Sequence, residues 1–196
     1  MSPDLPLKKS GVSTRAFLIV LTILGFSFFP TLIGAADTEG RFSLTSPVFH
    51  DGEAIPEAYT CKGADINPPL EISNPPVGVH EFVLTVREPD NPIGPWSHWL
   101  VFHISPATRM IAQNSVPGTQ ALNDFGNFYY GGPCVFDAKP HHFVFTVFAL
   151  NDLLDNVNEG STLDVLEKAM RGKVIGKAQL IGTYRNPLWG QDDPPL

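Results

Sequence analysis

Residues 88–104 read Glu-Pro-Asp-Asn-Pro-Ile-Gly-Pro-Trp-Ser-His-Trp-Leu-Val-Phe-His-Ile, an acidic, proline-pinned loop that runs straight into an aromatic and β-branched strand. The run from His98 to Ile104 is apolar on both faces, which is typical of a strand covered on each side in the centre of a sheet. His98 opens this strand, a few residues after the carboxylates of Glu88 and Asp90. The stretch therefore predicts a buried β-strand with acidic groups and a histidine at its mouth.

A second segment repeats the arrangement. Gly131-Gly132-Pro133-Cys134 and a short loop precede His141-His142, which open an apolar strand ending at Leu150. Glycine allows close approach of the backbone, and imidazole and backbone N–H groups donate to anionic oxygens. Carboxylates, two histidines and glycine backbone at neighbouring strand mouths predict a small pocket that accepts an anion.

Short apolar runs separated by prolines and glycines favour a loop-rich, mainly β domain over a helical bundle. The 19 prolines and 17 glycines are spread along the whole chain. Further strands are expected at 81–87 and 177–184, with a weaker one at 41–46. The strand at 81–87 alternates with a period of two, which predicts that only one of its faces is buried. Segments 51–76 and 110–138 are expected to be long, ordered loops.

One helix is expected after Ser161, which is placed to cap it. Its apolar stripe consists of Leu163, Leu166, Ala169 and Met170, and Gly172 marks its end. A short helical turn is expected at 152–158.

The first 36 residues have the pattern of a secretory signal, with a basic beginning, an apolar run at 16–36 and small residues at its exit. Cleavage is expected near Ala36. The alternative is an uncleaved membrane anchor, because the run of 21 residues is close to the ~20 that a transmembrane helix needs. The predicted organisation is a signal peptide at 1–36, one domain at 37–185 and a flexible tail at 186–196, in a protein that is exported to the periplasm or the cell exterior.

The mature chain is acidic. Loss of residues 1–36 removes three basic residues and one acidic residue and shifts the formal net charge from −7 to −9. No basic stripe is present, so nucleic acid is not an expected partner. An anion site in such a chain has to be formed by a local group of side chains and backbone N–H groups, because the net negative charge of the domain repels anions.

Cys61 and Cys134 are the two cysteines of the chain. In an exported protein an even pair of cysteines favours a disulfide. Two separate thiols lining one pocket, or a reactive Cys134, are the alternatives that the sequence leaves open.

Seven short motifs, in order from about residue 41 to residue 185, are similar to those of the phosphatidylethanolamine-binding protein family, in particular its prokaryotic Raf-kinase-inhibitor-like branch. The matching pieces are Ala58-Tyr59-Thr60-Cys61-Lys62-Gly63 with Asn67-Pro68-Pro69-Leu70, Glu88-Pro89-Asp90-Asn91-Pro92, Trp96-Ser97-His98-Trp99, Asn123-Asp124-Phe125-Gly126, Gly132-Pro133-Cys134, Lys139-Pro140-His141 and Ile181-Gly182-Thr183-Tyr184.

The resemblance implies two antiparallel sheets with Greek-key connections, one or two short helices and a shallow pocket that accepts phosphate or phosphorylated head groups. It also implies which residues bind the ligand: Glu88, Asp90, His98, Gly132, Pro133 and His141. Among these, Asp90 is expected to accept backbone N–H bonds and hold its own loop. His142 is expected to face away from His141 by strand alternation.

Three positions differ from the family pattern. Glu88 stands where the family usually has Asp, Asn91 replaces Ala, and Phe143 replaces a Tyr whose hydroxyl would donate to a ligand. The fold is expected to tolerate these changes, whereas the head-group preference depends on them. The Glu88 carboxylate repels a dianion and suits a protonated monoester or a zwitterion.

The expected function is non-catalytic binding of a small anionic or zwitterionic ligand without a cofactor, with an unidentified protein partner as a further expectation from the family. An enzyme is the first alternative, using Cys134 with a histidine, or Glu88 with His98 as an acid–base pair. The second alternative is a zinc site built from His98, His141 and Glu88. No Gly-x-Ser-x-Gly, P-loop or His-Glu-x-x-His motif supports the enzyme.

Overall fold

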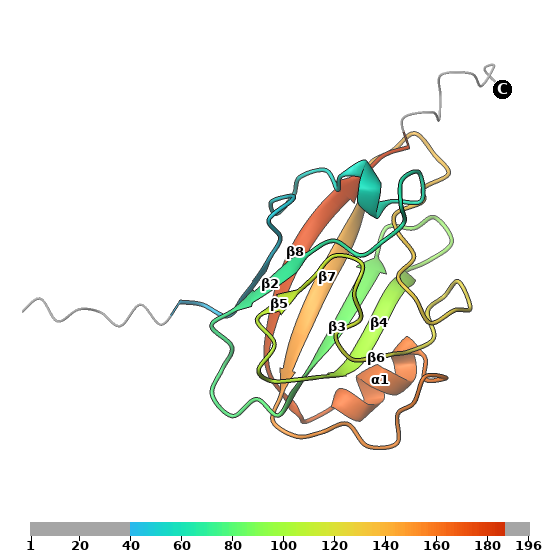
Figure 1. Ribbon diagram of the computed structural model, residues 1–196. Coiled ribbons are helices and arrows are strands. Elements are labelled where there is room, and N and C mark those ends of the chain that lie inside the picture. The colour runs from blue at the N-terminus through green and yellow to red at the C-terminus, as the bar shows by residue number, and fades with distance from the viewer. Residues whose placement is uncertain (1–39, 187–196) are drawn as a thin grey trace, which may run out of the picture. The chain divides into compact units, whose positions relative to one another are not determined.

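The computed structural model describes residues 40–186, which form two antiparallel sheets and one α-helix (Figure 1). The elements are β1 Ser43–Thr45, the 3-10 turn η1 Glu57–Tyr59, β2 Leu70–Ser73, β3 Glu81–Glu88, β4 Trp96–Ile104, β5 Met110–Ile111, β6 Thr119–Gln120, β7 His141–Leu150, α1 Leu163–Met170 and β8 Val174–Tyr184. The larger sheet has the strand order β6-β4-β3-β7-β8 and the smaller one β1-β2-β5. The predicted mainly β fold with two antiparallel sheets is confirmed.

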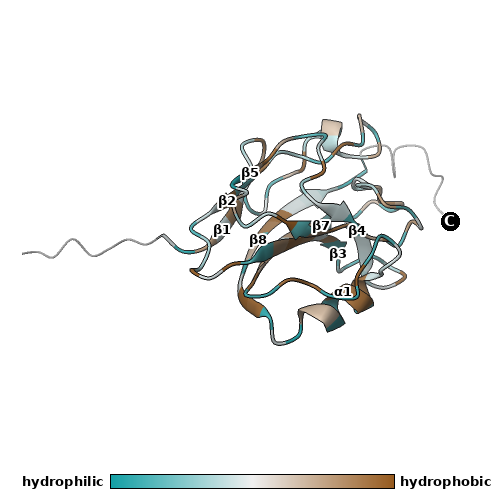
Figure 2. Cartoon of the chain, turned by 60° about the horizontal axis from the view of Figure 1, so that its bottom comes forward, coloured by the Kyte–Doolittle hydropathy of each residue, from teal (hydrophilic) through white to brown (hydrophobic). Residues whose placement is uncertain are grey.

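The larger sheet is covered on both faces. Figure 2 shows β1, β2 and β5 on one side of it and α1 on the other. Ile72 of the smaller sheet and Leu84 of β3 belong to the core between the sheets, whereas Val83 of β3 packs with Leu166 and Met170 of α1. The expectation that this strand is buried on one face is therefore wrong, because the helix covers the second face.

Three strands rich in apolar residues, β4, β3 and β7, occupy the middle of this sheet. β3 pairs with β4 on one side and with β7 on the other, and β8 follows β7. The prediction that the strands containing His98–Ile104 and Phe143–Leu150 lie centrally is confirmed. Both strands are antiparallel to β3 and begin beside its last residue, Glu88, so their opening residues lie close to Glu88.

The helix lies where the apolar stripe predicted it, but its start differs in detail. Thr162 is the residue before the first turn and makes no side-chain capping bond. The Ser161 hydroxyl instead accepts from the Asn158 N–H at 2.9 Å. The helical turn expected at 152–158 is not formed, and Leu154 in that segment is buried in the core beneath α1. The short strands β2, β5 and β6 lie in the two segments expected to be loops, because runs of two to four residues carry too little periodicity to predict a strand.

None of the helices within residues 40–186 has both the length and the apolar character required to span a bilayer. The predicted signal segment at 1–36 and all of the predicted tail after Asn186 lie outside the described residues.

Candidate functional site

Glu88 lies buried between two imidazole rings. Its Oε2 is 3.2 Å from His98 Nε2 and accepts from Asn91 Nδ2 at 2.8 Å. Its Oε1 accepts from His141 Nδ1. The side chain of Glu88 is 3% exposed, so nearly all of its interactions are with protein. The structure thus brings the predicted Glu88, His98 and His141 into one cluster, and one carboxylate joins both rings.

His98 reaches this cluster because of a β-bulge. Trp99 pairs with Val86 and Ser97 pairs with Arg87, which leaves His98 as an extra residue on β4. A bulge of this kind changes the direction of a side chain and is common next to functional sites. In a regular ladder His98 would share the face of Leu100, which packs on the α1 side. At the bulge its ring lies against Phe143, in the core on the opposite face.

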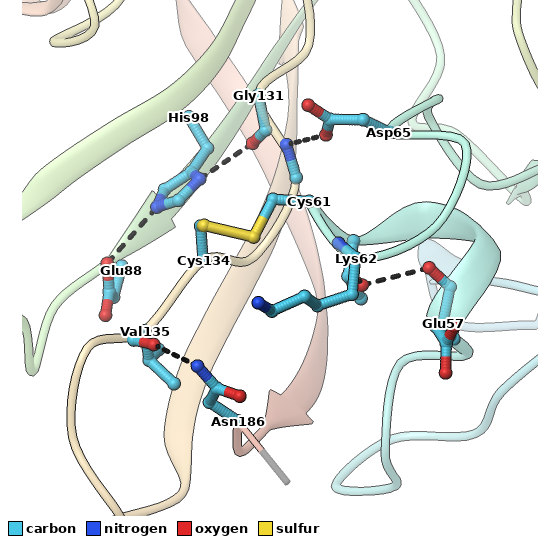
Figure 3. The surroundings of a disulfide bond; sticks show 12 residues. Glu57, Cys61, Lys62, Asp65, Glu88, His98, Gly131, Cys134, Val135 and Asn186 are labelled. Atoms are coloured by element: carbon cyan, nitrogen blue, oxygen red, sulfur yellow. Dashed lines mark hydrogen bonds and ion pairs between the residues drawn. A yellow bond between two sulfur atoms is a disulfide. The ribbon is translucent and has the colours of Figure 1, made fainter. Parts of the chain in front are cut away.

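The ring of His98 is fixed on both sides (Figure 3). Nδ1 donates to the Gly131 carbonyl at 2.7 Å, and the Gly131 N–H donates back to the His98 carbonyl at 3.1 Å. Phe125 and Phe143 pack edge-on against the ring, with centroids 5.1 and 5.0 Å away. Phe143 is fully buried, so it holds the imidazole in place by packing where a tyrosine would add a hydroxyl.

His141 lies between two carboxylates. Nδ1 faces Glu88, and Nε2 is 3.1 Å from Asp137 Oδ1. Burial disfavours the charged ring, but the hydrogen bonds to Glu88 and Asp137 outweigh burial and raise the pKa of His141 above its ordinary value. Because both ring nitrogens face acceptors, the geometry favours the doubly protonated imidazolium.

The charge of Glu88 is stabilised in the same way. Burial alone would raise the pKa of its carboxyl, yet the hydrogen bonds from His98, Asn91 and His141 together lower it. The cluster therefore keeps a carboxylate and an imidazolium in contact in a site that is almost closed to water.

This cluster forms the floor of a pocket of about 300 Å³. The remaining lining is mostly apolar: Pro92, Ile93, Trp96, Phe125, Cys134, Val135 and Phe136. Ile93 and Phe136 are largely exposed at 80% and 73%. A polar floor under apolar walls suits a ligand that has a charged or hydrogen-bonding end and a less polar remainder.

Gly132 and Pro133 lie beside the cluster but are not among the residues that line this pocket. The Gly132 N–H donates to Asp65 Oδ1 at 2.6 Å, and the Pro133 carbonyl accepts from the Cys61 N–H at 3.1 Å. A Cβ on Gly132 would come within 2.6 Å of the Tyr59 carbonyl oxygen. In this structure the glycine serves close packing of two loops, and its amide is not directed at the pocket.

Asp90 also lies next to the cluster without lining the pocket. Its carboxylate accepts the His142 N–H at 3.1 Å and faces His142 Nδ1 at 2.8 Å. Asp90 therefore does accept a backbone N–H, but the donor belongs to β7 and not to its own loop. The side chain of His142 is 54% exposed and does not line the pocket, as strand alternation predicted.

The predicted disulfide between Cys61 and Cys134 is confirmed, with the two Cα atoms 5.4 Å apart (Figure 3). The bridge ties the loop after η1 to the segment that leads into β7, and Cys134 lines the pocket. No cysteine in residues 40–186 is free. The two alternatives that require free thiols do not apply to this bridged form.

Three partners in the site were not identified from the sequence. Asp137 contacts His141 from four residues earlier in the chain, Asn91 donates to Glu88, and the carbonyl of Gly131 accepts from His98. An acid at that spacing from a site histidine is the one signal that could have pointed to Asp137. The carbonyl of Gly131 carries no side-chain signal at all.

Comparison with known proteins agrees with this architecture. The family model described as phosphatidylethanolamine-binding protein matches residues 45–185. The chain belongs to the phosphatidylethanolamine-binding protein family. A UPF0098 protein of Pyrococcus horikoshii is 38% identical over 176 residues, covering 85% of this chain and 86% of its own. A UPF0098 protein of Chlamydia trachomatis is 40% identical over 147 residues, covering 72% and 97%.

Solved structures of the phosphatidylethanolamine-binding protein family have the same fold. The crystal structure of a phosphatidylethanolamine-binding protein homologue from Chlamydia trachomatis, CT736, superposes with a TM-score of 0.71 at 37% identity and covers 74% of this chain and 97% of its own. The crystal structure of E. coli YbcL, described as a new member of the mammalian family, gives a TM-score of 0.70 at 28% identity, with coverage of 75% and 99%. The two antiparallel sheets are therefore those of the family.

Proposed function

We propose that this family member binds a small phosphate-type anion or a phosphorylated zwitterionic head group in the pocket above Glu88, without turning it over. The observation that carries the proposal is the shared carboxylate: one buried acid joins the rings of His98 and His141 at the floor of a single hollow. The two rings are therefore within reach of one small ligand.

The balance of charge supports a particular kind of ligand. Two carboxylates, Glu88 and Asp137, line the pocket together with the imidazolium of His141. A dianion would meet strong repulsion from the carboxylates at such short range, while a protonated phosphate monoester or a zwitterion would meet less. Trp96, which also lines the pocket, has a buried indole Nε1–H without a hydrogen-bond partner among residues 40–186.

The absence of turnover is part of the proposal and rests on the state of the reactive groups. Cys134, the nucleophile of the enzymatic alternative, is bonded to Cys61. In the other alternative, the acid–base pair of Glu88 and His98, both ring nitrogens of His98 are bonded within the chain, to Glu88 and to the Gly131 carbonyl, so neither faces a substrate. We also propose that the protein is exported after cleavage near Ala36, because a disulfide persists in an oxidising compartment. Modulation of a protein partner is a further proposal, taken from the family.

Metal binding is the weaker alternative. Glu88, Asp90 and His141 offer ligand atoms that lie within 4.8 Å of one another. This set differs from the predicted zinc ligands, since Asp90 takes the place of His98. A metal would have to displace the proton shared by Glu88 and His141, which lowers its affinity. Elemental analysis of the purified protein, before and after chelation, would test this alternative.

Calorimetric titration with inorganic phosphate and with phosphoethanolamine tests the proposed function. His141→Ala should weaken binding at least about tenfold, the equivalent of one charge-assisted hydrogen bond. His98→Ala should weaken it less, because His98 supports the site through its bond to Glu88. His50→Ala is the matched control, because this histidine is exposed and does not line the pocket. Equal affinities for all three variants would refute the site.

A further inference from the structure

The hydrogen bonds of the two rings leave no ring nitrogen open to a ligand. His98 donates to the Gly131 carbonyl and faces Glu88, while His141 faces Glu88 and Asp137. All four nitrogens therefore have partners within the chain. A ligand that accepts a hydrogen bond from either ring has to displace Glu88, the Gly131 carbonyl or Asp137.

These three partners differ greatly in how firmly they are held. Glu88 is buried and receives three hydrogen bonds, and Gly131 is buried with its N–H and carbonyl both paired to His98. The side chain of Asp137 is 34% exposed, and its other hydrogen bond within residues 40–186 is from the N–H of Lys139, in its own turn. Displaced into water, the Asp137 carboxylate regains hydration, whereas a displaced buried group would not.

The segment that carries Asp137 is short and fastened at both ends. Before it, Cys134 is bridged to Cys61 and the Val135 carbonyl accepts from Asn186 Nδ2 at 3.2 Å. After it, His141 begins β7. Asp137 can therefore move only locally and stays close to the ring. A tethered group of this kind acts at an effective concentration on the order of millimolar.

We propose that Asp137 is an internal competitor that sets the affinity of this pocket for anions. The ligand's anionic oxygen takes the place of the Asp137 carboxylate at His141 Nε2, and the released side chain turns to solvent. This inference rests on the proposed function and names the residue of that pocket that limits how tightly anions bind.

The competition predicts a preference among anions. A simple carboxylate such as acetate offers His141 the same acceptor that Asp137 already provides, so the exchange gains little. A phosphate group brings additional oxygens and a hydroxyl, which can interact with further groups of the pocket beyond the displaced bond. Phosphate should therefore be bound in preference to acetate, and removing Asp137 should tighten the binding of both anions by the same factor, because the fraction of free molecules with an open ring limits both equally.

Calorimetric titration of inorganic phosphate into the wild type and three variants tests the inference. Asp137→Ala should bind phosphate about three- to tenfold more tightly, as expected if Asp137 occupies the ring in roughly 70–90% of free molecules. Asp137→Asn should gain less, because its amide oxygen still accepts from His141. Asp124→Asn is the charge control: this exposed residue does not line the pocket and bonds no ring nitrogen, and its amide oxygen can still accept the Ser97 N–H, so a gain below about twofold is expected.

The outcomes separate this inference from the proposed function. If the wild type binds phosphate and Asp137→Ala binds it equally well, or if Asp124→Asn gains as much as Asp137→Ala, the competitor role is wrong and the binding site stands. If no variant binds phosphate, both proposals fail together. The side-chain carboxyl carbon resonance of Asp137 gives an independent measure: it should shift toward that of a solvated aspartate on saturation with phosphate, and an unchanged resonance would overturn the inference.

Discussion

The two ends of the β3–β4 pair carry the same residue types but surround them with different hydrogen-bond partners. β3 begins at Glu81 and ends at Glu88, both buried, and each faces a histidine of β4. Each histidine lies at an irregularity of pairing: His98 is the extra residue of one bulge, and His103, with φ +53°, lies within the other. The ends nevertheless differ in hydrogen bonding, and that difference separates a candidate binding site from a structural one.

At the Glu81 end, donors are scarce. Glu81 Oε1 accepts from the Leu154 N–H at 2.9 Å, while Oε2 is buried without a hydrogen-bond partner in the described residues and lies 3.7 Å from His103 Nε2. Burial therefore dominates and raises the pKa of Glu81, opposed by the Leu154 N–H and by His103. The pKa of Glu88 is lowered in a site that is just as buried. Burial alone does not determine the charge of a carboxyl, because the number and kind of its donors decide the outcome.

The largest effect on the free energy of unfolding should come from removing the disulfide near Glu88. Replacing both Cys61 and Cys134 by serine opens a loop with a sequence separation of 73, for which the chain-entropy relation gives about 4 kcal/mol of unfolding free energy. Urea unfolding followed by tryptophan fluorescence would measure this loss. A loss below about 1 kcal/mol would mean that the bridge constrains the unfolded chain far less than its span implies.

A matched pair of substitutions compares the two glutamates directly. Glu88→Gln removes a charge that is held by three donors and should cost about 2–3 kcal/mol at neutral pH. Glu81→Gln keeps the acceptor for Leu154 and removes a poorly compensated buried charge, so its effect should lie within about 1 kcal/mol of zero. If both variants lose the same free energy of unfolding in denaturant, the two glutamates are equally well compensated and the two ends do not differ.

The pH dependence of stability should also differ in sign between the ends. The contribution of Glu88, whose pKa is lowered, is present above the ordinary value of 4.5 and is lost as pH falls through its folded pKa. Glu81, whose pKa is raised, binds its proton more tightly when folded, so it reduces stability as pH rises from 4.5 through its folded pKa. Unfolding free energies of the two glutamine variants, subtracted from the wild type across pH 3–8 as a rough span, should diverge in these two directions.

The contribution of His141 to stability should change with pH in a higher range than the contributions of the two glutamates. Its raised pKa means that its contribution is complete below the ordinary value of 6.5 and is lost as pH rises through the folded pKa. His141→Gln should flatten the stability curve in that range. A ring titration followed by NMR at or below 6.5 would contradict the ion pairs to Glu88 and Asp137.

A small effect is also expected at His103. Its side chain is 41% exposed, and its Nε2 donates to the Leu154 carbonyl at 3.0 Å. His103→Ala should cost only about 0.5–1.5 kcal/mol, the usual net value of one hydrogen bond. His98→Ala in the same assay should cost more, because that ring is buried with both nitrogens bonded. The opposite ranking would show that the better-bonded end is not the more stable one.

How far the sequence predicted the site depends on the kind of information each part carries. Long apolar runs placed β3, β4 and β7, and the family resemblance brought Glu88, His98 and His141 together. The contact with Asp137 and the occupation of the Gly132 amide by Asp65 were not predicted. Both are set by loops whose path follows from the disulfide and from packing, and neither leaves a periodic pattern in the sequence.

Because of the extra residue on β4, the pocket depends on the number of residues in this strand as well as on their side chains. Deleting Ser97, which is no member of the acid–histidine cluster, would let the ladder between β3 and β4 close regularly. The imidazole would then turn toward α1, with every member of the cluster still encoded. Among relatives, a gap of one position before this histidine is therefore a more telling mark of a lost pocket than a conservative exchange within it.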